Sequence, residues 1–124
     1  MATVHYLKRS KGEAVLKIYS TNSAGETVDV DLADLATPDQ TFDANNAIVT
    51  IKEIYWGAKK DKQIDITRAD NGGFHGHYYL LNTGSYDFNG FVDDVYPGGN
   101  IRVIGDGKFH VVLKLNKTAG YTDA

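Results

Sequence analysis

The sequence contains no cysteine, which excludes disulfide bonds, thiolate catalysis, zinc fingers and iron–sulfur clusters. Proline is scarce as well, with only two residues. No apolar run approaches the roughly 18 residues of a membrane-spanning helix, and the N-terminus lacks the apolar core of a signal peptide. The formal charge of -3 and the pI near 5.7 argue against nucleic-acid binding, which depends on cationic contacts to phosphate. We therefore expect neither a membrane nor a nucleic acid as a partner.

What is present is typical of one globular β-rich domain. The chain has 124 residues, enough for a single domain with a core of its own and too few for two ordinary ones. Apolar residues make up 42% and charged residues 23%, so the chain is too apolar for a disordered tail. Thirteen glycines, eight tyrosines and five phenylalanines favour strands joined by tight turns.

Alternating apolar residues predict most of the strands. Thr27–Leu32 alternates strictly and places Val28, Val30 and Leu32 on one face. Ala47–Trp56 is apolar on both sides near its two ends, which predicts a strand inside a sheet rather than at its edge. The same reasoning predicts strands at Thr3–Lys8, Ala14–Ser20, Gln63–Ala69, Phe74–Asn82, Ser85–Val92, Asn100–Ile104 and Lys108–Asn116.

The turn residues predict how the strands are joined. Asn22–Glu26 and the Gly105–Gly107 segment both have the composition of hairpin connections, and Asp70–Gly73 is the strongest turn signal in the chain. We also expect a turn at Thr83–Gly84 and a bulge at Gly90. Between the strands, one helical turn is expected at Asp34–Ala36 and a loop at Asp39–Asn46.

Eight or nine strands at spacings near ten residues predict an all-β fold. We expect a single antiparallel β-sandwich or flattened barrel, of the jelly-roll or immunoglobulin-like kind, that takes in residues 1–124. Residues 1–12 are expected as an N-terminal arm and residues 117–124 as a C-terminal arm.

A metal site is the first chemistry to consider. His75 and His77 stand two residues apart on a predicted strand, so they are expected to point to one face. A β-sheet metal site of this kind needs a carboxylate a few residues on, and none follows at that spacing. His5 or His110 would have to complete the set, and nothing in the sequence places either nearby. We expect ordinary surface imidazoles, and neither a metal nor another cofactor.

Carboxylates and glycine-rich turns give no stronger signal for catalysis. Asp93 and Asp94 are adjacent in a glycine-rich loop, where facing solvent or loosely binding calcium is commoner than acid–base work. Asp29 and Asp31 fall on the outward face of a strand. No catalytic serine motif is present, and no glycine pair precedes a helix that would bind phosphate. We predict no catalytic residue.

Aromatic residues are the remaining candidates for a functional surface. Large rings gather in the last part of the chain, and tyrosine supplies contact area at low entropic cost in protein interfaces. The candidate interface residues are Tyr78, Tyr79, Tyr86, Tyr96 and Tyr121. Two alternatives stay open: the rings fill the core, or exposed tyrosines together with Trp56 stack on carbohydrate.

Several segments resemble small virion structural proteins of marine tailed bacteriophages. The segments that carry the resemblance are Glu13–Tyr19, Ile54–Gly57, Ile64–Arg68, Asp87–Asp93, Val111–Lys117 and the pair Gly120 and Tyr121. That class contributes no catalytic residues. The resemblance implies a structural role in the virion, as a β-rich subunit that decorates or cements the capsid, or that sits at the neck or tail.

From this resemblance we expect a non-enzymatic subunit that binds the major capsid protein of a virion assembled in the host cytoplasm. Many copies with modest contacts would bind through avidity, and a homotrimer at a capsid three-fold position is the favoured arrangement. The alternatives are a neck or tail subunit and a carbohydrate- or receptor-binding module. A metal-dependent enzyme built on His75 and His77 is the third reading.

Overall fold

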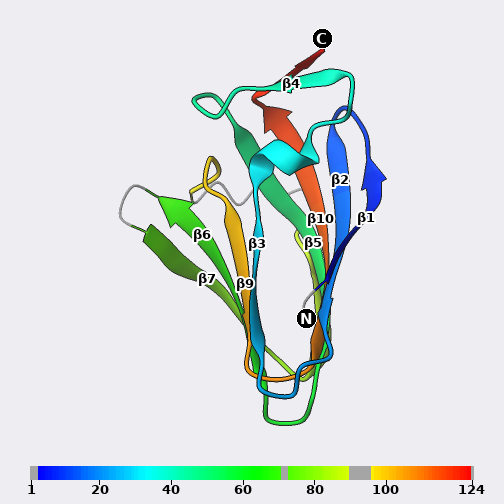
Figure 1. The fold of residues 1–124 in the computed structure, drawn as a ribbon, viewed down its shortest axis with the longest axis vertical. Coiled ribbons are helices and arrows are strands. Elements are labelled where there is room, and N and C mark those ends of the chain that lie inside the picture. The colour runs from blue at the N-terminus through cyan, green and yellow to red at the C-terminus, as the bar shows by residue number, and fades with distance from the viewer. Residues whose placement is uncertain (1–2, 71–72, 90–95, 124) are drawn as a thin grey trace.

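The computed structural model describes residues 3–70, 73–89 and 96–123. Within them, strands make up almost all of the regular structure, with one short 3-10 helix, η1, at Leu32–Leu35 (Figure 1). The strands are β1 Thr3–Arg9, β2 Glu13–Ser20, β3 Glu26–Val30, β4 Gln40–Phe42, β5 Ile48–Ala58, β6 Gln63–Asp70, β7 Gly73–Leu81, β8 Thr83–Asp87, β9 Ile101–Gly105, β10 Phe109–Ala119 and β11 Tyr121–Asp123.

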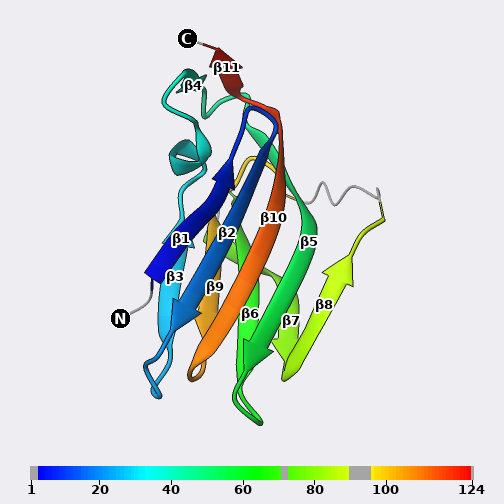
Figure 2. The same cartoon turned by 90° about the vertical axis from the view of Figure 1, so that its right-hand side faces the viewer.

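Two antiparallel sheets pack face to face. The larger sheet has five strands in the order β1-β2-β10-β5-β8, and the smaller has four in the order β3-β9-β6-β7. Figure 2 shows the larger sheet in front of the smaller one. A separate two-stranded ribbon of β11 and β4 lies at one end of the sandwich (Figure 1). The all-β sandwich predicted from the alternation is confirmed.

The strand order is that of a jelly roll. With β1 set aside, the larger sheet runs β2-β10-β5-β8 and the smaller runs β3-β9-β6-β7. Each strand of one sheet therefore lies over a strand that is its neighbour in the chain, and Figure 2 shows the same correspondence. Short arches join these pairs at one end of the sandwich, and the long connections lie at the other end (Figure 1). This arrangement is the double-sheet jelly roll.

Two predicted hairpins are wrong, and one predicted turn is displaced. Asn22–Glu26 and Gly105–Gly107 do not close hairpins, because the strands that they join lie in opposite sheets. Thr83–Gly84 is the start of β8, and the chain turns instead at Asn82, which has a φ of 58°. A short glycine-containing connection suits an arch between sheets as well as a hairpin. At Gly25 the chain has a φ of 88°, and a Cβ there would lie 2.2 Å from the carbonyl oxygen of Gly105 in the neighbouring arch.

The hairpin between β6 and β7 is as predicted in its pairing, with Asp70 opposite Gly73. Residues 71 and 72 of that turn lie outside the described residues. The bulge expected at Gly90 also lies outside them. Of the strand expected over Ser85–Val92, the described part ends earlier than predicted, at Asp87.

The core fills the space between the two sheets. On β2 and on β10 as far as Lys117 every second residue is buried, in agreement with the predicted alternation, and on β6 only Thr67 and Asp70 depart from it. The fully buried apolar side chains on these strands are Ala14, Leu16, Ile18, Ile64, Ile66, Val111 and Leu113. Burial of one such large side chain stabilises the fold by roughly 1.5–3 kcal/mol. The sandwich therefore has a continuous core of its own.

The irregular segment after β3 is more ordered than predicted. The carboxylate of Asp31 accepts a hydrogen bond from the Ala33 N–H at 3.0 Å and so caps η1. The loop predicted at Asp39–Asn46 contains β4, which pairs with β11. This pairing had no sequence signal, because both strands are only three residues long.

The segments expected as arms lie in sheets over their described parts. In the N-terminal segment β1 pairs with β2, and in the C-terminal segment Lys117 belongs to β10 before β11 pairs with β4. Within the described residues, no helix has the length and apolar character needed to cross a membrane.

Candidate functional site

Two of the candidate interface tyrosines meet where the sheets end side by side. β7 is an edge strand of the smaller sheet, and β8 is an edge strand of the larger one. The ring centroids of Tyr78 on β7 and Tyr86 on β8 are 6.1 Å apart, and Phe88 lies 5.8 Å from Tyr78 and 6.3 Å from Tyr86. Tyr78 is half-buried, whereas Tyr86 is 45% exposed. We call Tyr78, Tyr86 and Phe88 the edge cluster.

Tyr79 and Tyr96 lie apart from the edge cluster. Tyr79 is 64% exposed, and its hydroxyl lies over the backbone of Gly76 on the same strand. Tyr96 stacks on His75 at 5.0 Å between ring centroids. The predicted interface residues are therefore spread over more than one surface, and Tyr79 lies next to the edge cluster in sequence only.

Tyr121 holds the C-terminal ribbon against the sandwich. Its hydroxyl donates a hydrogen bond to the Leu32 carbonyl oxygen at 2.5 Å, and its ring packs on Phe42 at 5.2 Å. The Lys117 ammonium lies 4.6 Å from the ring centroid. Burial raises the pKa of the Tyr121 phenol far above the ordinary value of 10.0. This tyrosine therefore packs within its own chain.

The raised pKa of Tyr121 predicts a loss of stability in alkali. Above pH 10 the unfolded chain releases the phenol proton and the folded chain keeps it, so unfolding becomes more favourable as pH rises. We expect the free energy of unfolding to fall by up to about 1 kcal/mol per pH unit. Denaturant titrations between pH 9 and 11 would measure this.

The Tyr121→Phe variant is the control for the alkaline loss. It removes the titrating phenol, so its free energy of unfolding should change less between pH 10 and 11 than that of the parent protein. Burial lowers the pKa of Lys117, so this group acts in the opposite sense: its contribution rises just below pH 10.5. An equal alkaline loss in both proteins would contradict the assignment to Tyr121.

His75 and His77 make separate contacts. A bulge in the pairing of β6 with β7 falls between Gly76 and Tyr78, so the regular alternation that would align the two histidines is interrupted. His75 Nε2 lies 2.7 Å from the Asp70 carboxylate, whereas His77 packs edge-on against Tyr78 at 4.6 Å. No group of three or more metal-ligating side chains comes together among the described residues.

Of the four candidate aspartates, the structure describes two. Asp93 and Asp94 lie outside the described residues. Asp29 forms a two-point ion pair with Arg102, at 2.6 Å from Nε and 3.1 Å from Nη2, and the hydrogen bond from Arg102 lowers the pKa of Asp29. Asp31 caps η1. Both described aspartates therefore have structural partners on the surface.

A buried arginine, which the sequence analysis did not single out, fixes one of the long connections. Arg68 on β6 is 0% exposed. Its guanidinium donates to the carbonyl oxygens of Val49 at 3.0 Å, Pro97 at 2.9 Å and Gly99 at 2.9 and 3.1 Å. These bonds join the connection between β8 and β9 to the start of β5. The inward position of Arg68, in phase with Ile64 and Ile66, was the available signal.

A buried lysine holds the other long connection, between β3 and β5, in place. Lys117 on β10 is 7% exposed, and desolvation by burial lowers its pKa. Its ammonium donates to the carbonyl oxygens of Ser10 at 2.8 Å and Leu35 at 2.7 Å, and to Oε1 of Gln40 at 2.6 Å. The lysine therefore ties the turn between β1 and β2, η1 and β4 to the end of β10.

Both buried cations therefore hold connections of the framework in place. Comparison of the chain with family models, curated proteins and solved structures finds no match.

Trp56, the main candidate for stacking on carbohydrate, is buried in the structure. Trp56 is 8% exposed, its indole N–H donates to the Leu81 carbonyl oxygen at 3.0 Å, and its ring packs on Tyr86 at 5.1 Å. A Cβ at Gly84 would lie 2.7 Å from the indole, so that glycine makes room for it. An indole enclosed in this way presents no face to a sugar.

Proposed function

We propose that this protein is a non-enzymatic structural subunit of a bacteriophage virion that decorates or cements the capsid by binding the major capsid protein. The observation that carries the proposal is the jelly-roll strand order. This architecture occurs in viral capsid subunits, lectin domains and cupins. The enclosed Trp56 and the separate contacts of His75 and His77 favour the first of these three settings.

The edge cluster supports a contact surface for such a subunit. β7 and β8 are edge strands, and an edge strand can receive a strand of a neighbouring protein through main-chain hydrogen bonds. The rings of Tyr86 and Phe88 lie beside these edges and would add contact area. A symmetric trimer would present three such surfaces, and its many copies on a shell would bind through avidity.

Purified particles of a phage that encodes this chain test the proposal. We expect the protein at a fixed ratio to the major capsid protein, and particles that lack it should release their DNA at a lower temperature. A reconstruction would distinguish the capsid from the neck or tail. If the protein is missing from purified particles, the proposal fails.

A matched pair of tyrosines tests whether the edge is the contact surface. Tyr86 at the edge and Tyr55 on the outer face of the larger sheet are 45% and 42% exposed, respectively. We expect Tyr86→Ser to weaken binding to particles stripped of this protein by about tenfold, more than truncation of most interface residues costs. Tyr55→Ser should leave binding unchanged. Equal losses in the two variants would place the contact elsewhere.

A further inference from the structure

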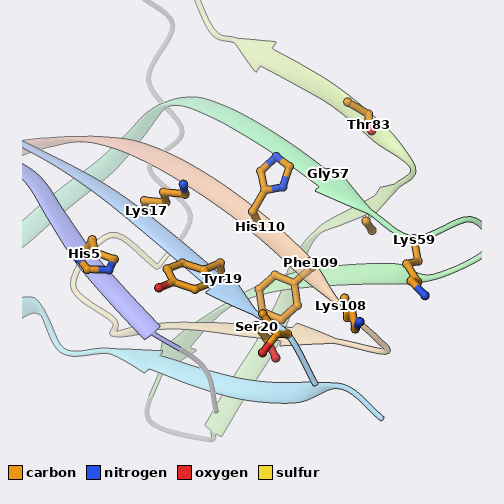
Figure 3. Close-up of a pocket in the computed structure, with 12 residues that line it drawn as sticks. His5, Lys17, Tyr19, Ser20, Gly57, Lys59, Thr83, Lys108, Phe109 and His110 are labelled. Carbon is orange, nitrogen blue, oxygen red and sulfur yellow. The ribbon is translucent and has the colours of Figure 1, made fainter. Parts of the chain in front are cut away.

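A basic groove runs across the outer face of the larger sheet, at the end where the short arches lie. Its volume is about 680 Å³, within the range of pockets that hold ligands. The side chains that shape it include His5, Lys17, Tyr19, Lys59, Lys108 and His110. They come from β1, β2 and β10 and from the connections that follow β5 and precede β10 (Figure 3).

Flat rings form the floor of the groove. His110 stands opposite Tyr19 on β2 and opposite Gly57 on β5. A Cβ at Gly57 would lie only 2.3 Å from Cε1 of His110, so the glycine lets the imidazole lie against the sheet. His5 stacks on Tyr19, with ring centroids 5.7 Å apart and planes 10° from parallel. These contacts give the groove a built floor of ring surfaces.

The groove is positively charged although the chain as a whole carries -3. Lys17, Lys59 and Lys108 line it, and none of its described lining residues is an aspartate or glutamate. Within the described part of the chain, these three lysines take part in no ion pair. Glu53, on the same face of β5, is held by Lys114 at 2.9 Å. The unpaired charge is therefore available to an anionic partner.

The cations lie at two ends of the floor. The backbone N–H of Lys59 donates to the Lys108 carbonyl oxygen at 3.4 Å, so these two lysines are neighbours. Figure 3 shows them on the opposite side of His110 from His5 and Lys17. A single small anion would meet one end only. A chain that carries several negative charges would meet both ends and cover the rings between them.

We propose that this groove binds an acidic, extended segment of a protein partner. Carboxylates of the segment would pair with Lys17 at one end and with Lys59 and Lys108 at the other, and the aliphatic parts of its side chains would cover His110. Lysine ammonium groups act as point charges, which suits single carboxylates. The proposal concerns a different face from the edge cluster and does not depend on a role in the virion.

Binding of a fluorescein-labelled hexaglutamate peptide, measured by anisotropy at low salt, tests the proposal. We expect saturable binding that weakens as salt rises. Lys17→Gln and Lys59→Gln should each weaken it by about two- to fivefold, as expected for one exposed ion pair. Lys60→Gln is the matched control, because Lys60 makes the same charge change next to Lys59 and does not line the groove.

Gly57→Ala tests the shape of the groove without changing its charge. The added methyl group would displace His110 from the floor, and we expect weaker peptide binding. If this variant fails to fold, the lysine variants decide the question alone. Three results would overturn the proposal: no saturable binding, an equal loss for Lys60→Gln and Lys59→Gln, or equally tight binding of a six-nucleotide oligothymidylate with the same lysine dependence.

Discussion

Replacement of Arg68 by alanine is expected to remove about 3–5 kcal/mol from the free energy of unfolding. The guanidinium is fully buried and supplies hydrogen bonds to the carbonyl oxygens of Val49, Pro97 and Gly99. Without it, these carbonyls lose a charged donor and the core gains a cavity. A single domain is usually stable by only about 5–15 kcal/mol, so this variant should lose a large share of its stability.

Denaturant titration of Arg68→Ala beside Arg102→Ala would measure this effect. Arg102 is also an arginine in the smaller sheet, but it is partly exposed and its ion pair with Asp29 lies at the surface. Its replacement should cost much less than that of Arg68, because an exposed ion pair contributes little to stability. Arg68→Lys should fall between the two, since one ammonium cannot reach all of the carbonyls. Equal losses for the two alanine variants would show that Arg68 does not hold the connection between β8 and β9.

Replacement of Lys117 by alanine is expected to cost about 2–4 kcal/mol. Its ammonium satisfies two backbone carbonyls and the amide oxygen of Gln40 in a largely buried site. Loss of the ammonium leaves these acceptors unpaired. The loss should appear first in η1 and β4, as faster amide hydrogen exchange, because these elements have few other contacts with β10.

Lys114→Ala is the control for Lys117, because Lys114 lies on the same strand but pairs with Glu53 at the surface. We expect Lys114→Ala to destabilise the fold much less than Lys117→Ala and to leave hydrogen exchange in η1 unchanged. A Lys117→Ala protein as stable as Lys114→Ala would contradict the structural role of the buried ammonium.

The alternation of apolar residues was sufficient to predict most strands and the class of fold. Val28, Val30 and Leu32 are buried as their spacing indicates. The two buried cations also fall at positions that the alternation places inward. Arg68 continues the inward series of Ile64 and Ile66, and Lys117 continues that of Val111, Leu113 and Leu115. A charged residue in phase with a buried face was a usable signal of an internal donor.

The pairing of strands could not be predicted in the same way. A turn such as Gly105–Gly107 lets the chain reverse, but the choice between the neighbouring strand and the opposite sheet depends on where the other strands lie. The partners of β10, for example, are β2 and β5, which are far away in the sequence. Only the assembled sheets bring these strands together.

The candidate surfaces, too, could be predicted only in part from the sequence. Aromatic composition pointed to Tyr78 and Tyr86, which do meet at the edge, but it could not separate them from Tyr121, which packs inside its own chain. The basic groove had no sequence signal. Its floor combines His5, Tyr19, Gly57 and His110 from four strands, so it depends on strand register.

The acceptors of the two buried cations have a consequence for how the long connections can vary. All but one are main-chain carbonyls, which every amino acid possesses. Side chains at Ser10 and Pro97 can therefore change without removing the anchor. That end of the sandwich can therefore accommodate divergent loop sequences, and hence new recognition specificities, on an unaltered scaffold.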